Sequence, residues 1–203
     1  MTATWRSVAI LIFPGVELLD FAGPFEVFSA ARRNTDAPER LFDVFTVAES
    51  DAPIRCNNPV TVVPDYTLES CPQADILVIP GGQGTRTAVN RPALIAWIRD
   101  RAAAAEITTS VCTGSFLLGQ AGLLDGKAAT THWGSVERMR ERFANVSVRA
   151  RTRWVDEGAV ISSAGVSAGI DMALHVIERL HGADAAAATA HWIEYDYWKN
   201  DHG

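Results

Sequence analysis

The chain has 203 residues, of which 48% are hydrophobic, enough for one good core but not for two ordinary domains. Its formal net charge of −6 would repel a nucleic-acid backbone, and no lysine or arginine cluster reverses that charge locally. No apolar stretch approaches the roughly 20 residues that span a bilayer. Residues 1–7 do not show a basic region followed by a long apolar run, as a signal peptide would. We therefore expect one domain over residues 1–203, soluble and cytoplasmic, with no nucleic-acid or membrane partner.

The pattern of the three cysteines indicates a reducing compartment and does not indicate a metal site. Cys56, Cys71 and Cys112 form neither a CxxC pair nor a Cys/His zinc spacing, and an odd number is a poor disulfide framework. We expect free thiols in a reducing cytoplasm, and no metal site.

Taken in order, apolar runs alternate with helical patterns. Strands are predicted at 8–13, 41–47, 75–79 and 107–111, with a short extended piece at 60–63. Helices are predicted at 18–28, 92–104, 114–121, about 135–143, 169–181 and from 184 onward. An extended run at 146–155 turns at 156–158 and returns at 160–162. The alternation predicts an α/β fold with a mostly parallel sheet.

Some finer features follow from the same patterns. Asn90 and Asp184 are expected to cap the helices that come after them. Three arginines alternate on the run at 146–155 and should form one solvated face, namely Arg149, Arg151 and Arg153. Trp133 is expected to pack against the sheet, and Asp171 to cap or line the last core helices.

A strand, a sharp turn and a helix are predicted around Cys112. Residues 107–111 are β-branched or small, and residues 114–121 contain helix formers that end before Gly122. At the corner between them, free N–H groups and the helix dipole would lower the pKa of the Cys112 thiol. Gly114 would let the backbones pack closely, as in the nucleophile elbow of hydrolases. The pattern favours a cysteine nucleophile; the alternative is an inert cysteine in the sheet core.

Two further groups are predicted at the same edge of the sheet. The strand at 8–13 delivers Glu17 and Asp20 to the start of a helix, where either acid can complement the helix dipole. We prefer that interpretation for Glu17 and leave Asp20 open to a role in the site. The glycine-rich turn at 80–84 has no phosphate-loop pattern, so the N–H of Gly82 is a candidate oxyanion donor or part of an ordinary tight turn. His132 is placed either near the thiol or in a backbone-satisfied position elsewhere.

Five segments together resemble the ThiJ/PfpI superfamily over about residues 8–192. They are Phe13-Pro14-Gly15, Leu19-Asp20-Phe21-Ala22-Gly23-Pro24, Pro80-Gly81-Gly82, Ser110-Val111-Cys112-Thr113-Gly114 and Ala164-Gly165-Val166-Ser167-Ala168-Gly169-Ile170-Asp171. The resemblance implies a flavodoxin-like sandwich with a cysteine nucleophile elbow, and a homodimer.

Within that superfamily, Asp20 and the Cys112-Thr113 pair resemble the isonitrile hydratase branch, which adds water to an isonitrile to give an N-substituted formamide. The resemblance implies that Cys112 is the nucleophile, Asp20 the acid/base and Thr113 a supporting hydroxyl, with Thr113 and Gly82 as backbone donors and no cofactor. Peptidase relatives carry histidine directly after the cysteine, so Thr113 disfavours proteolysis. AraC-type regulators continue into a helix-turn-helix region that these 203 residues lack, which disfavours DNA binding. The alternative function is a non-enzymatic sensor or redox-responsive cysteine protein related to the N-terminal domain of those regulators.

The chemistry sets one further expectation. An isonitrile carbon accepts a nucleophile readily only if it also gains a proton, so a thiolate and an acid must reach one atom. If Asp20 and Cys112 lie close, two negative charges would repel, and the pair should share one proton with the carboxyl pKa raised.

Overall fold

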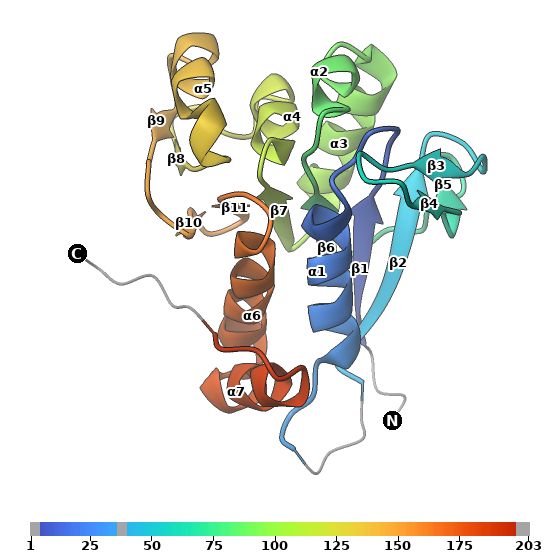
Figure 1. Cartoon of the computed structure of the whole chain (residues 1–203), viewed down its shortest axis with the longest axis vertical. Helices are drawn as coiled ribbons and strands as arrows, with labels where there is room; N and C mark the ends of the chain where they lie inside the picture. The colour runs from blue at the N-terminus through green and yellow to red at the C-terminus, as the bar shows by residue number, and fades with distance from the viewer. Residues whose placement is uncertain (1–4, 36–39, 198–203) are drawn as a thin grey trace.

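A seven-stranded sheet forms the centre of the computed structural model, which describes residues 5–35 and 40–197 (Figure 1). The strand order is β10-β11-β7-β6-β1-β2-β5. Every pairing in this sheet is parallel except β10 with β11, which is antiparallel. The α/β fold with a mostly parallel sheet is therefore confirmed.

The bounds of the elements follow the sequence patterns closely. The strands of the main sheet are β1 (Arg6–Leu11), β2 (Phe42–Ala48), β5 (Tyr66–Thr67), β6 (Ile76–Ile79), β7 (Ile107–Val111), β10 (Trp154–Asp156) and β11 (Val160–Ser163). Two small sheets pair β3 (Ile54–Arg55) with β4 (Thr61–Val62) and β8 (Ala128–Ala129) with β9 (Ser147–Val148). The helices are α1 (Leu18–Ala30), α2 (Thr85–Ala88), α3 (Pro92–Ala104), α4 (Gly114–Gln120), a 3₁₀ turn (Trp133–Ser135), α5 (Val136–Arg142), α6 (Ala168–His181) and α7 (Ala183–Trp192).

Helices cover both faces of the sheet. From β1 the chain moves to the neighbouring strand β2 in one direction across the sheet, whereas from β6 it moves to β7 in the opposite direction. Because such crossovers are right-handed, α1 and α3 lie on opposite faces. Helix α6 packs beside α1 (Figure 1). The central strands β6 and β7 are buried along their whole length, so their carboxyl ends are rigid supports for any site placed there.

Three expectations about the run at 146–155 and its surroundings are wrong. The run is broken, because Arg151 has a φ of +60° and lies between β9 and β10. Arg153 does not face solvent with the others: its guanidinium forms an ion pair with the carboxylate of Asp171, which is fully buried in α6. Trp133 is 83% exposed, because it begins a 3₁₀ turn at the mouth of a cleft instead of packing on the sheet.

The two predicted caps are also wrong, each by a small displacement. Helix α3 has Arg91 at its N-cap, and the side-chain amide of Asn90 donates instead to the carbonyl of Arg86, at 3.3 Å. Helix α7 has Gly182 at its N-cap, so Asp184 lies within the first turn and complements the helix dipole there.

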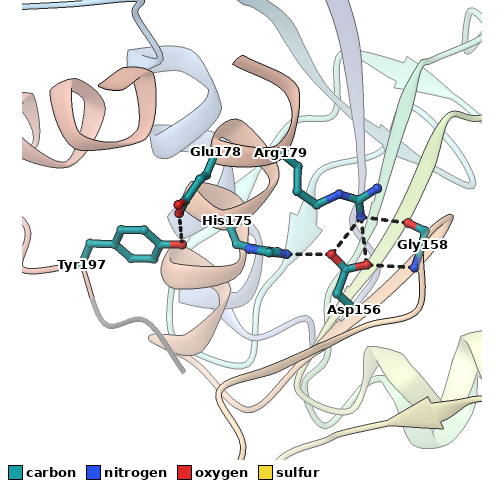
Figure 2. Close-up of polar contacts among 6 residues, drawn as sticks. All are labelled: Asp156, Gly158, His175, Glu178, Arg179 and Tyr197. Atoms are coloured by element: carbon teal, nitrogen blue, oxygen red, sulfur yellow. Dashed lines mark hydrogen bonds and ion pairs between the residues drawn. The ribbon is translucent and has the colours of Figure 1, made fainter. Parts of the chain in front are cut away.

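A polar cluster fastens the hairpin of β10 and β11 to helix α6, as Figure 2 shows. Asp156 accepts hydrogen bonds from the N–H of Gly158 at 2.8 Å and from the guanidinium of Arg179 at 2.9 Å, and its other oxygen lies 2.7 Å from Nε2 of His175. Partial burial would raise the pKa of Asp156, but the hydrogen bonds from His175 and Gly158 and the charge of Arg179 lower it overall. The cluster holds the edge of the sheet against α6.

Candidate active site

Cys112 occupies a strained backbone position directly after β7. Its φ is +58°, a conformation that L residues other than glycine seldom adopt. Its N–H is shared between the carbonyls of Ser163 and Ala164, at 3.2 and 3.1 Å. Its carbonyl accepts from the hydroxyls of Ser115 and Thr131, at 3.0 and 2.9 Å. The predicted sharp turn is confirmed, and both neighbouring strands and loops hold it in place.

Gly114 allows the turn to pack as the sequence predicts. A Cβ atom at this position would lie 2.0 Å from the carbonyl oxygen of Ile79, far inside van der Waals contact. Helix α4 can therefore begin directly against β6 only if residue 114 is glycine.

Asp20 reaches the thiol from α1. Its side chain is fully buried, and one carboxylate oxygen accepts from the N–H of Gly81 at 2.9 Å. The other oxygen accepts from the N–H of Val166 at 3.2 Å, and the thiol of Cys112 lies close enough for the thiol and the carboxylate to shift each other's pKa. The structure brings Asp20 and Cys112 together, and backbone N–H groups from outside α1 hold the Asp20 carboxylate. The sequence analysis missed the Val166 contact, because a backbone donor on a loop leaves no side-chain pattern.

The proton balance of this pair differs in part from the expectation. Burial raises the pKa of Asp20 from 3.8 to about 7, with a smaller contribution from the charge of Glu17 and against the hydrogen bonds from Gly81, Cys112 and Val166. Burial, followed by the charge of Asp20, raises the pKa of Cys112 from 9.0 to about 12, although hydrogen bonds from Thr113 oppose this. The raised carboxyl pKa is confirmed, but the predicted lowering of the thiol pKa is wrong. Burial beside a carboxylate outweighs the end of a helix of seven residues.

Thr113 and Gly82 form a small network beside the sulfur. Both the N–H and the hydroxyl of Thr113 form hydrogen bonds with Cys112. The N–H of Gly82 donates to the Thr113 hydroxyl at 3.0 Å, and the buried hydroxyl of Thr85 lies 3.1 Å from the same oxygen. The Thr113 N–H thus faces the sulfur, whereas the Gly82 N–H holds the Thr113 hydroxyl in place.

A cleft of about 300 Å³ opens onto Cys112, and both Thr113 and Val166 line it. His132 lies on the wall of the cleft, where its Nδ1 accepts a hydrogen bond from the N–H of Gly134 at 3.1 Å. Asp171 lies elsewhere, in its ion pair with Arg153.

Two kinds of structure are missing from the described part of the chain. Within residues 5–35 and 40–197, no three side chains of the types histidine, cysteine, aspartate and glutamate gather closely enough to hold a metal ion. Across the same ranges, no helix has both the length and the apolar character needed to cross a membrane.

Comparison with known proteins places this chain in a family. The sequence profile of the DJ-1/PfpI family matches residues 6–179, and the chain belongs to that family, which also carries the name ThiJ/PfpI. A crystal structure of a ThiJ/PfpI family protein from Pseudomonas syringae has the same fold, with a TM-score of 0.85 and 31% identity over 98% of this chain and 78% of that one.

Two relatives of different function are similar to this chain in sequence. An isonitrile hydratase from Pseudomonas putida is 35% identical over 188 residues, which cover 93% of this chain and 78% of that enzyme. The HTH-type transcriptional regulator CdhR from Pseudomonas aeruginosa is 32% identical over 177 residues, which cover 87% of this chain but 51% of the regulator. The chain spans about half the length of the regulator. An isonitrile hydratase and a transcriptional regulator are therefore both among its relatives.

Proposed function

We propose that this protein is an isonitrile hydratase, which adds water to an isonitrile and releases an N-substituted formamide. The observation that carries the proposal is the buried pair of Asp20 and Cys112, whose acid and thiol shift each other's pKa, with Cys112 lining a cleft. The similarity to the Pseudomonas putida enzyme supports the same reaction.

In the first step, above about pH 7, where Asp20 is ionised, the pair holds one proton, on sulfur, because burial and the charge of Asp20 raise the pKa of Cys112 above that of Asp20. Asp20 takes this proton as the sulfur attacks the terminal carbon of the isonitrile, and then delivers it to that carbon. A carbon–sulfur and a carbon–hydrogen bond form, and the product is a thioimidate bound to Cys112. The sequence analysis expected a preformed thiolate; here the carboxylate generates it during attack.

In the second step, Asp20 is again a carboxylate and takes a proton from water as the water oxygen attacks the thioimidate carbon. Asp20 passes this proton to the imine nitrogen. The carbon–sulfur bond then breaks, and the second proton of the water goes to the sulfur, which leaves as the thiol. Hydrogen bonds from the Thr113 N–H and hydroxyl stabilise negative charge on sulfur in both steps. One water molecule is consumed, and the reaction requires no metal or organic cofactor.

The direct test is to incubate the protein with cyclohexyl isocyanide and measure N-cyclohexylformamide by mass spectrometry. Cys112→Ala should abolish turnover, while Cys71→Ala, which removes another buried thiol far from the cleft, should not. Asp20→Asn should lower turnover by about 10² or more, the usual worth of a positioned acid/base. Formamide formation at the wild-type rate by either Cys112→Ala or Asp20→Asn would refute the mechanism.

The second candidate function is a sensor or redox-responsive cysteine protein, which the similarity to the regulator CdhR favours. Under this alternative the cleft binds its ligand without turnover. Absence of formamide, together with saturable quenching of tryptophan fluorescence by an isonitrile, would support the sensor over the enzyme.

We further propose that the protein is a cytoplasmic homodimer that does not bind nucleic acid. Free thiols at all three cysteines, the acidic net charge and the family resemblance support these assignments. Light scattering after size exclusion tests the dimer, and a gel shift with duplex DNA at low salt tests nucleic-acid binding. A monomer, or retarded DNA, would overturn the respective assignment.

A further inference from the structure

The cleft over Cys112 continues into a second hollow of about 340 Å³. Three residues line both spaces: Thr85 and Arg86 from α2, and Arg138 from α5. The second hollow is lined further by the apolar side chains of Val89 and Phe116. A ligand that reaches the sulfur with one end can therefore extend past two guanidinium groups onto an apolar surface.

These two arginines have no carboxylate partner among the described residues, unlike several others. Arg91, Arg140 and Arg179 each pair with a carboxylate. In residues 5–35 and 40–197, neither Arg86 nor Arg138 has a carboxylate within 4.0 Å, and the guanidinium of Arg138 lies instead 4.4 Å from the ring centre of Phe116.

The charges around this junction favour an anion. Burial, then the nearby charges of Arg86 and Arg142, lower the pKa of Arg138, which shows that like charges are crowded here. Two acids also line these spaces, and neither pairs with Arg86 or Arg138. The carboxylate of Glu17 accepts a hydrogen bond from the side chain of Asn57 at 3.1 Å, and Glu141 lines only the second hollow. The sequence alone predicted no local cluster of positive charge, whereas the fold brings Arg86 and Arg138 together beside the thiol.

We propose that the cleft selects ligands that carry a carboxylate, held by Arg86 and Arg138, and that the substrates are isonitriles with a carboxylate on the nitrogen substituent. The assignment of an isonitrile rests on the proposed function. The planar guanidinium suits this role because it can donate two parallel hydrogen bonds to a carboxylate. The apolar part of the substituent would pack on Val89 and Phe116.

The first experiment compares kcat/KM for isocyanoacetate and for its methyl ester, which differ mainly in charge. Wild type should prefer the acid, and Arg138→Gln or Arg86→Gln should lower the acid-to-ester ratio about tenfold, the worth of a charged hydrogen bond. Arg140→Gln is the matched control, because Arg140 lies on the same helix and pairs with Glu137. A ratio that neither Arg86→Gln nor Arg138→Gln changes would overturn the proposal.

The second experiment does not depend on hydration of isonitriles. Cys112 is alkylated at pH 9 with iodoacetate and with iodoacetamide, and the ratio of the two rates is followed by mass spectrometry. Taking the ratio removes any change in the thiolate fraction, since both reagents need the same thiolate. Arg138→Gln should lower the iodoacetate-to-iodoacetamide ratio about tenfold while Arg140→Gln leaves it unchanged.

The two experiments separate the two proposals. Turnover of cyclohexyl isocyanide without any preference for the acid would leave the hydratase standing and overturn the anion site. Absence of all isonitrile turnover, with an arginine-dependent alkylation ratio, would overturn the hydratase and support the carboxylate site. An unchanged alkylation ratio in both arginine variants would overturn the carboxylate site by itself.

Discussion

Replacing Asp20 by Asn should make the protein more stable at alkaline pH, although it removes a group of the proposed active site. The pKa of Asp20 is higher in the folded chain than in the unfolded chain. The stability that depends on the protonated Asp20 is therefore fully present below about pH 4 and is lost as the pH rises toward 7. In that window the unfolded chain releases the Asp20 proton and the folded chain retains it. Asparagine has no such proton, so the variant does not suffer this loss.

The size of the effect follows from the pKa of Asp20. A tenfold change in proton affinity corresponds to about 1.4 kcal/mol, so raising the pKa from 3.8 to about 7 costs the folded state about 4 kcal/mol at pH 8. Asn has one oxygen acceptor where the carboxylate has two, so the N–H of Gly81 or Val166 meets an amide NH₂, at a cost of about 1–3 kcal/mol. The variant should gain about 1–3 kcal/mol over wild type at pH 8, and lose most of that gain by pH 5.

The assay is urea unfolding of wild type and Asp20→Asn at pH 5 and pH 8. The difference in unfolding free energy between the two proteins should change by about 2–3 kcal/mol between these pH values, in favour of the variant at pH 8. Asp125→Asn removes the same formal charge from an exposed position and controls for net charge. A difference for Asp20→Asn that stays constant within about 0.5 kcal/mol would show that the carboxyl is not perturbed by burial, and the reasoning would fail.

Three other outcomes follow from the site. Because Asp20 must be ionised to accept the thiol proton, kcat/KM should rise about tenfold per pH unit below pH 7 and level off above it, and a profile that falls above pH 7 would contradict this role. Loss of the neighbouring carboxylate should lower the pKa of Cys112, so Asp20→Asn should speed alkylation of this thiol by iodoacetamide at pH 8; slower alkylation would count against the repulsion. Gly114→Ala would place a Cβ 2.0 Å from the carbonyl oxygen of Ile79 and should destabilise the protein by about 2 kcal/mol or more in urea unfolding, and an unchanged midpoint would exclude the close packing.

The parts of the site that the sequence predicts are those with local causes. The elbow at Cys112 follows from a β-branched strand, a glycine two residues later and a helix, all within one short segment. Asp20 was expected at the same place because the carboxyl ends of neighbouring parallel strands meet at one edge of a sheet, and β1 and β7 flank β6. Both inferences need only periodicity and topology.

The parts that it does not predict depend on distant neighbours. The thiol pKa is set by burial and by a carboxylate 92 positions away in the sequence, which a local helix dipole argument leaves out. The hydrogen bond from Val166 to Asp20 uses only backbone, and Arg86 and Arg138 come together from two short helices. Arg153 appeared solvated because its partner Asp171 lies on a different element.

The contacts of Asp20 also bear on the order in which parts of the site form while the chain is synthesised. The donors come from the loops after β6, β7 and β11, and the last of them, Val166, lies 146 residues beyond Asp20. As the ribosome releases the chain from its N-terminus, Cys112 emerges well before Val166 and the strand that accepts its own N–H. Until that strand docks, the sulfur is an ordinary exposed thiol, open to oxidation and to mispairing with Cys56 or Cys71. The pairing of Asp20 with Cys112 thus requires that β11, the last strand of the sheet along the chain, has docked beside β7.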